Sequence, residues 1–160
     1  MKFRFYQLYY LLSAVLLVVT MCGTLLHMIA MDSGATYTLG SFSLIKPDGT
    51  ATYSVVALGV VLIVATLVNA FGLFVSLFSN FELQKRASIL SVLLLTGFYI
   101  LLAVYALLVI NSDEAVTTIS LEAEIMFPFT AIVLGVLSFL SARRTEAKIL
   151  AKATGFRLRD

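Results

Sequence analysis

Few side chains in this sequence are of the kinds that carry out chemistry or bind metals. The 160 residues contain one histidine, His27, and one cysteine, Cys22. One cysteine rules out an internal disulfide and argues against a cysteine-based metal site. A lone histidine is more often a hydrogen-bonded packing residue than a ligand, because a metal site needs several donors. The sequence therefore predicts no catalytic residue, no metal site and no cofactor.

The longer motifs of enzymes and of nucleic-acid-binding proteins are missing as well. The sequence has no serine, histidine and aspartate set and no glycine-rich loop of the kind that cradles phosphates. Ionisable residues inside membrane spans usually mark transport or catalysis, and the long apolar runs of this chain carry no formal charge. Long basic runs of the kind that bind nucleic acid are also absent. We therefore expect neither an enzyme nor a nucleic-acid-binding protein.

The one concentrated set of charged side chains is basic and lies at the C-terminal end, in residues 143–160. It consists of Arg143, Arg144, Lys148, Lys152, Arg157 and Arg159. Ala147, Leu150 and Ala151 share one face of the helix that this tail favours. We therefore predict a basic cytoplasmic helix that contacts anionic lipid headgroups. The alternative is a charged stop that only anchors the topology.

The composition requires a lipid environment for most of the chain. The apolar fraction is 61% and the mean hydropathy is +1.03, more than a soluble domain can bury. Four apolar runs without formal charge are of a length to cross a bilayer as helices. They cover residues 8–31, 54–79, 87–110 and 125–142. We predict an all-α membrane protein, in which residues 1–160 form one domain of four antiparallel transmembrane helices.

The first apolar run has an alternative interpretation as a cleaved signal peptide. A basic start followed by an apolar run, as after Lys2 and Arg4, is typical of such peptides. The run is too long for the apolar part of an ordinary signal peptide, however. Met21 is also too bulky for the position before the cysteine of a lipoprotein cleavage site. We therefore expect the first helix to be retained.

The first polar interval, residues 32–53, has the pattern of strands. Apolar and polar residues alternate through it, with a change of phase at Gly40-Ser41 that predicts a bulge. The segment Lys46-Pro47-Asp48-Gly49 is typical of a turn. We predict a short β-hairpin on the membrane surface.

The second polar interval, residues 111–124, ends in a further strand pattern. Residues 118–125 alternate without a break, and a third strand would stabilise a hairpin that is marginal alone. We therefore predict that this segment joins the hairpin. If the two intervals form one sheet, Leu39, Phe42, Leu44, Ile119 and Leu121 should be substantially less exposed than the threonines and serines between them.

The distribution of positive charge predicts the orientation of the chain. Of the eleven Lys and Arg residues, only Lys46 lies in the two polar intervals that would face outward. The other ten lie near the start, in the connection around residues 80–86 and in the tail. Because positive charge is retained on the cytoplasmic side, we expect both termini in the cytoplasm.

Small or polar residues inside the apolar runs are suited to close helix packing. Gly72 and Ser76 are spaced so that two helices can approach closely, and Asn69 can hydrogen-bond to a neighbouring helix. The residues predicted to pack helices are Asn69, Gly72, Ser76, Gly97 and Gly135.

Aromatic residues form a second pattern around the end of the second run. Phe71, Phe74, Phe78 and Phe81 fall on one helical face. Such a face is more often in contact with lipid or with the protein interior than part of a ligand pocket, which is the alternative.

Three short motifs resemble a known family. They are the opening Gln7-Leu8-Tyr9-Tyr10-Leu11-Leu12-Ser13-Ala14, the basic connection Leu83-Gln84-Lys85-Arg86 and the ending Arg157-Leu158-Arg159. Together they resemble a domain-of-unknown-function family of small four-helix inner-membrane proteins of Bacteroidetes bacteria. Phe156 departs from this pattern, because an acidic residue is expected there. The resemblance implies the four-helix fold over the whole chain, and it implies no activity.

Two classes of function fit these observations. The first is a non-enzymatic accessory or scaffold subunit that offers helix faces and an outer β-surface to another membrane protein or to a second copy of itself. The second is a small transporter or lipid-handling protein, which the four spans and the phenylalanine face allow. Membrane lipids are expected partners in both.

The predicted topology can be tested with a reporter that is active only outside the cytoplasm. Because the positive charges are concentrated on one side, fusions at Gly49 and at Asp113 should be active, and a fusion after Asp160 should be inactive. Activity of the fusion after Asp160 would contradict the model of four spans with cytoplasmic ends.

Overall fold

The computed structural model describes residues 5–30, 36–45, 51–78, 80–112 and 116–153. These residues form four α-helices, one short 3-10 helix and five strands. In chain order they are α1 (Phe5–Cys22), β1 (Thr24–Ala30), β2 (Thr36–Gly40), β3 (Ser43–Ile45), β4 (Ala51–Ser54), α2 (Val56–Leu77), α3 (Phe81–Ser112), β5 (Val116–Leu121), η1 (Ala123–Ile125) and α4 (Met126–Ala153).

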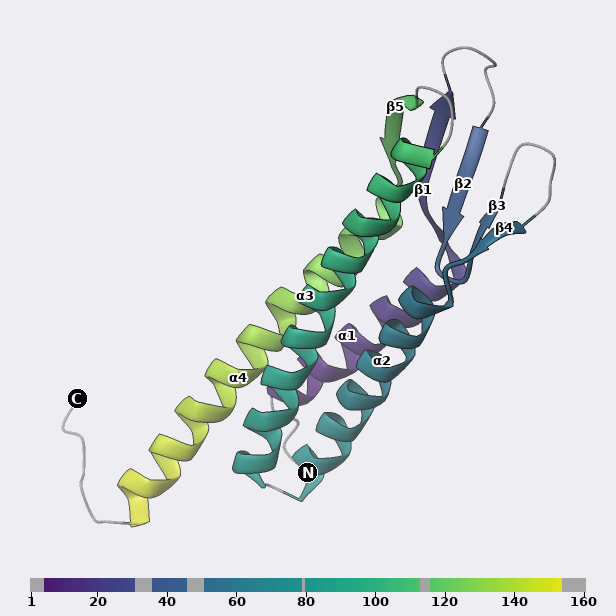
Figure 1. Ribbon diagram of the computed structural model, residues 1–160. Helices are drawn as coiled ribbons and strands as arrows, with labels where there is room; N and C mark the ends of the chain where they lie inside the picture. Colours follow the sequence, from purple (N-terminus) through teal and green to yellow (C-terminus); the bar gives the residue numbers. More distant parts are fainter. Residues whose placement is uncertain (1–4, 31–35, 46–50, 79, 113–115, 154–160) are drawn as a thin grey trace.

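The helices run side by side in alternating directions, and the sheet lies at one end of them (Figure 1). Helix α1 packs against α2 and α4, and α3 packs against the same two helices, so the four enclose a common interior. The first turn of α1 and the last turns of α4 lie at the end away from the sheet (Figure 1). Every connection at the sheet end passes through one or more strands, since α1 leads into β1, β4 leads into α2, and β5 joins α3 to α4.

Three of the helical segments are long and apolar enough to cross a membrane. They are Val56–Leu77, Phe81–Leu108 and Ala123–Ala151. Helix α1 is apolar but shorter, with 18 residues and a length of about 27 Å.

The predicted first span, residues 8–31, is wrong in its second part. The helix ends at Cys22, and Thr24–Ala30 form β1. This strand pairs with β2 on one edge and with β5 on the other, so its backbone groups are hydrogen-bonded without a helix. An uninterrupted apolar run can be a buried strand as well as a helix, and here the two neighbouring strands decide between them.

The outer β-structure is larger than the predicted hairpin with one added strand. It is an antiparallel sheet of five strands in the order β4-β3-β2-β1-β5. Two strands are additional. One is β1, which lies between β2 and β5 in the sheet, and the other arises because the predicted first strand of the hairpin is divided into β2 and β3. The final segment does join the sheet, but its strand ends at Leu121 and a 3-10 turn follows at Ala123–Ile125.

The predicted bulge at Gly40-Ser41 is instead a change of strand. Strand β2 ends at Gly40 and β3 begins at Ser43. The buried Ser41 hydroxyl donates to the carbonyl oxygen of Thr20 at 3.1 Å, which fixes this corner to the end of α1. The predicted turn at residues 46–49 lies outside the described residues.

One face of the sheet continues the core of the helices. Leu26, Met28, Leu39 and Leu44 are buried in the same cluster as side chains of α2 and α3, including Phe98. Leu39 and Leu44 are buried, in agreement with the prediction of low exposure. The other three residues of that prediction, Phe42, Ile119 and Leu121, are exposed. The error has a physical reason for β5, because among the described residues it is an edge strand that packs mainly against β1.

Helices α3 and α4 are both longer than the predicted spans 87–110 and 125–142. Helix α3 starts at Phe81, and the side-chain oxygen of Asn80 accepts a hydrogen bond from the Leu83 N–H at 3.4 Å, as a helix cap does. The basic connection is therefore mostly the first turns of α3. Helix α4 continues without interruption to Ala153, so residues 143–153 of the tail are the end of the fourth helix and not a separate helix.

Candidate functional site

The interior of the four helices contains a cluster of polar side chains around Tyr10. The Tyr10 side chain is 1% exposed, and its hydroxyl donates to the carbonyl oxygen of Gln84 at 2.8 Å. A second hydrogen bond, of 2.5 Å, joins the same hydroxyl to Ser88 Oγ. A tyrosine hydroxyl has one hydrogen, so it donates to Gln84 and accepts from Ser88. This pair of bonds ties α1 to the first turns of α3.

Gly72 of α2 makes room for the Tyr10 ring. A Cβ atom at Gly72 would lie 2.6 Å from Cε1 of Tyr10, which is closer than atoms can approach. The absence of a side chain therefore lets α2 lie directly against the ring. Helices α1, α2 and α3 thus meet at one tyrosine.

A second polar contact joins α2 to α3 beside this cluster. Asn69 is fully buried, and its amide nitrogen donates to Ser91 Oγ of α3 and to the Ala65 carbonyl oxygen of its own helix, both at 2.9 Å. Ser76 is also buried, but its hydroxyl bonds only within α2, to the carbonyl oxygen of Leu73. Asn69 therefore bridges two helices, as its position in an apolar run suggests.

Several buried polar atoms in this interior have no hydrogen-bond partner within the described part of the chain. They are both side-chain amide atoms of Gln84, the hydroxyl oxygens of Ser13 and Ser138, and the side-chain oxygen of Asn69. Buried side-chain amides are ordinarily hydrogen-bonded, so the Gln84 amide is the least satisfied polar group of this interior.

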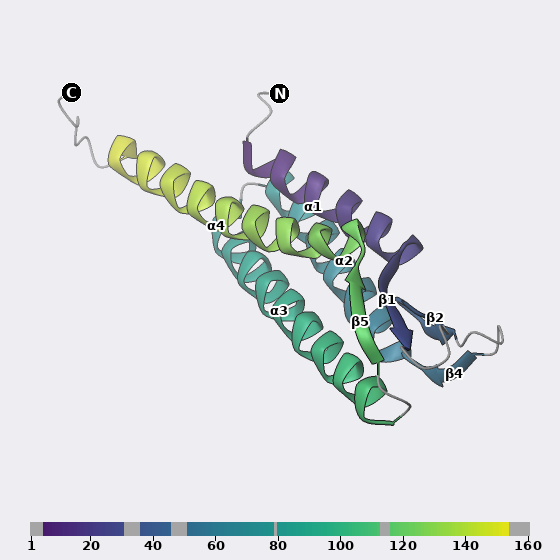
Figure 2. The same ribbon diagram turned by 90° about the horizontal axis from the view of Figure 1, so that it is seen from above.

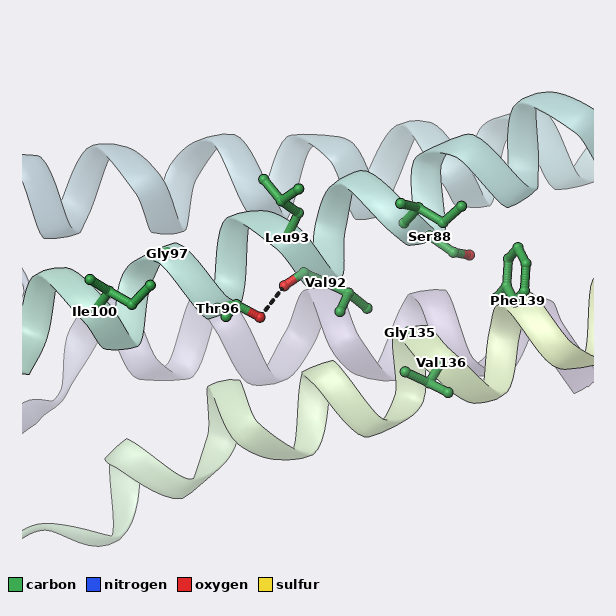
Figure 3. A pocket seen from close by; sticks show the side chains of 10 residues that line it. Ser88, Val92, Leu93, Thr96, Gly97, Ile100, Gly135, Val136 and Phe139 are labelled. Atoms are coloured by element: carbon green, nitrogen blue, oxygen red, sulfur yellow. Dashed lines mark hydrogen bonds between the residues drawn. The ribbon is translucent and has the colours of Figure 1, made fainter.

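An apolar groove lies on the outer surface between α3 and α4. Its volume is about 610 Å³. The lining side chains are Ser88, Ile89, Val92, Leu93, Thr96, Gly97 and Ile100 of α3 and Gly135, Val136 and Phe139 of α4 (Figure 3). Leu93 and Ile100 are more than half exposed. Ser88 belongs both to this groove and to the Tyr10 cluster, so the two sites share one side chain.

Two glycines have different roles in this groove. A Cβ atom at Gly135 would lie 3.0 Å from Val92 Cγ2, so this glycine lets α3 and α4 touch at the floor of the groove. A Cβ atom at Gly97 would meet no heavy atom within 4 Å. Gly97 is predicted to lie in a close helix contact, but the structure leaves it in open space, five residues beyond Val92 on α3 (Figure 3).

The phenylalanine face lies mostly on the surface. Phe71, Phe74 and Phe78 are each more than half exposed, and the rings of Phe74 and Phe78 contact edge to face. Phe71 also lines a shallower apolar groove of about 380 Å³ between α2 and α3. The exposure of these rings fits contact with lipid.

Charged side chains occur at both ends of the helices. At the sheet end, His27 Nε2 lies 3.3 Å from Glu122 Oε1. At the opposite end, Lys85 Nζ donates to Glu146 Oε2 at 2.8 Å and so joins α3 to α4. The described residues contain no group of three or more His, Cys, Asp and Glu side chains placed to hold a metal ion.

The basic residues of the tail lie along the end of α4. Arg143, Arg144 and Lys148 are exposed. Lys152 lies in the last turn of the described helix, and Arg157 and Arg159 lie outside the described residues. Contact of these six side chains with lipid headgroups stays a prediction.

Residues 4–148 match the family described as domain of unknown function (DUF4293). The chain belongs to this family. No curated protein matches it.

The DUF4293 assignment gives the Tyr10 cluster added interest, because two of the motifs that resemble a family meet there. Tyr10 belongs to the opening motif and Gln84 to the basic connection before the third span, and the two are hydrogen-bonded. Sequence reasoning did not identify Tyr10, Gln84 or Ser88 as a cluster. The available signal was that Tyr10 and Ser88 are polar residues within apolar helices. The separation of residues 10 and 84 in the sequence, however, does not indicate that they are in contact.

The two glycines Gly72 and Gly97 provide a matched test of interior packing in this DUF4293 chain. Replacing Gly72 with Ala should lower the unfolding free energy by about 1–3 kcal/mol, because the added methyl group overlaps the Tyr10 ring. Replacing Gly97 with Ala should leave it unchanged or raise it by up to about 1 kcal/mol, because alanine favours the helix and meets open space. Thermal unfolding of both variants in the same detergent measures the difference.

A third variant checks the cause. If the clash is with the ring, replacing Tyr10 with Leu should recover part of the loss in the Gly72→Ala protein, and the two effects should not add. Equal effects of Gly72→Ala and Gly97→Ala would show that Tyr10 does not organise the helix contact.

Proposed function

We propose that the protein is a non-enzymatic integral protein of a bacterial inner membrane that acts as an accessory or scaffold subunit. The membrane assignment is supported by three helices of sufficient length and apolar character and by the short apolar α1. The described Lys and Arg residues belong to the first turns of α3 and the last turns of α4, at the end away from the sheet, which supports a cytoplasmic location of that end. The sheet then faces the outer side.

The observation that carries the scaffold proposal is the groove between α3 and α4. A transmembrane helix needs small residues opposite it in order to approach closely, and this groove offers Gly97 and Thr96 along α3. At Gly97 the space is open enough for a side chain or a backbone of a partner to enter. We propose that a transmembrane helix of a partner protein packs there.

A second function is favoured by the lining of the same groove. Apart from Ser88 and Thr96, its side chains are apolar, and Leu93 and Ile100 are exposed where lipid would surround them. A lipid acyl chain fits such a surface, and the volume of about 610 Å³ lies in the range of ligand sites. On this alternative the protein binds or handles lipid.

Site-specific photo-crosslinking in native membranes separates the two functions. A photoreactive residue at Leu93, which is 65% exposed in the groove, should give a protein adduct, and one at Val15, which is 52% exposed on α1, should give none. Lipid that co-purifies with the protein, without a protein adduct at Leu93, supports lipid handling instead. If there is neither a protein adduct at Leu93 nor co-purified lipid, both proposed functions are contradicted.

Filling the groove should remove its occupant without affecting the fold. Replacing Gly97 with Leu places a large side chain in open space, and we expect the crosslink at Leu93 to fall by at least about tenfold, because overpacking of a helix interface costs about 1–3 kcal/mol. The control is Ala70→Leu at an exposed position of α2, outside the groove, which should leave the crosslink unchanged. Adduct yield and thermal unfolding are measured for both variants.

A further inference from the structure

We propose that the free edge of β5 binds an extended segment of a second protein by strand addition on the outer side of the membrane. This inference deepens the scaffold proposal by naming the chemistry of the partner, and it rests on the proposed membrane orientation. The evidence comes from the backbone of β5, from its side chains and from its place in the fold.

The backbone N–H and C=O groups of two residues on β5 point away from β1, toward the free edge of the sheet. Within the described residues β5 is an edge strand with β1 as its one neighbour. The Glu122 N–H bonds to the Leu25 carbonyl oxygen, and in an antiparallel ladder every second residue bonds to the same neighbour. Ser120 and Thr118 therefore bond to β1. The N–H and C=O groups of Ile119 and Leu121 face the open edge.

The side chains of the same two residues are apolar and exposed. Leu121 is 66% exposed and Ile119 is 44% exposed. They stand opposite Leu26 and Met28 of β1, whose side chains are buried on the core face of the sheet. Paired residues of neighbouring strands share a face, so the core face continues onto β5, where the described part of the chain leaves Ile119 and Leu121 exposed.

A partner segment in extended conformation would both pair the free backbone groups of β5 and cover its apolar side chains. Water hydrogen-bonds to the free backbone groups but leaves the apolar side chains exposed, and lipid covers the side chains but leaves the backbone groups unpaired. A partner strand pairs with the N–H and C=O groups and places its own apolar residues beside Ile119 and Leu121. The partner segment therefore has apolar residues at alternate positions.

The position of β5 links this edge to the proposed groove. Strand β5 connects the end of α3 to the start of α4, the two helices that form the groove. In Figure 2, β1 lies on the side of β5 away from α3, so the free edge faces the side of the groove. One partner can thus place a transmembrane helix in the groove and an extended segment on β5.

A symmetric second copy of this chain does not fit the edge. Two copies in one membrane are related by an axis along the membrane normal, because both must keep the same orientation. Strand β5 runs in the general direction of the helices (Figure 1), so it lies roughly along this axis. Two β5 strands related by the axis would therefore be parallel, and their core faces would point in opposite directions. A two-fold antiparallel pair needs an axis across the strands, which would invert one copy in the membrane.

The free edge itself is tested by amide hydrogen exchange of the purified protein. The N–H groups of Thr118 and Ser120 should exchange at least tenfold more slowly than those of Ile119 and Leu121, because only the first pair bonds to β1. Slow exchange at all four residues would show that the edge is already paired and would overturn the proposal.

The partner is tested by photo-crosslinking in native membranes from a residue placed at Leu121. We expect an adduct with a different protein, and adducts from positions 119 and 121 should map to partner residues two apart.

Adding Ile119→Pro should remove the adduct at position 121, because it deletes an outward N–H that the fold does not use. The control Ile119→Val keeps that N–H and should retain the adduct. Both variants should unfold at the temperature of the parent protein, whereas Ser120→Pro should unfold earlier.

Three results would overturn strand addition. They are the absence of an adduct at position 121, an adduct that contains only this chain, and an adduct that survives Ile119→Pro in the folded protein. A crosslink at Leu93 that persists in any of these cases would leave the groove proposal standing, so the two proposals fail separately.

Discussion

The contact of Tyr10 with α2 and α3 is the interaction on which the arrangement of the helices depends. Lipid is as apolar as a helix surface, so moving apolar side chains from lipid into a contact between helices stabilises that contact little. The Tyr10 hydroxyl supplies two directed hydrogen bonds to α3, and Gly72 admits the ring to α2. The bonds have defined geometry, and they therefore fix the rotation and height of α1, from which β1 and the sheet continue.

The sheet extends the packing of the short helix α1 through strand β1. Helix α1 ends at Cys22, and the chain continues directly into a strand that pairs on both edges. The apolar side chains of this strand join the core of α2 and α3, so the helices and the outer sheet share one interior. A movement of the sheet would therefore be transmitted to the helices through packed side chains and not only through the connections.

The groove at Gly97 and the free edge of β5 both lie on the α3 and α4 side of the structure. On the other side, α1 and α2 carry the sheet through β1 and β4, and their interior faces are filled by Tyr10 and Asn69. Helices α3 and α4 are joined by the edge strand β5, and the groove between them is open at Gly97.

The sequence by itself determined the number of helices, their approximate positions and the presence of outer strands, because hydrophobic runs and alternation are local properties. It also indicated that Asn69 and Gly72 suit helix contacts. The tertiary structure alone decided that residues 24–30 form a strand, because an apolar run is compatible with either form until neighbouring strands pair with it. It alone brought Tyr10 to Gln84 and left Gly97 in open space, since these depend on how distant helices are rotated. The exposure of Ile119 and Leu121 was likewise beyond the sequence, because alternation shows which residues share a face and not whether anything covers it.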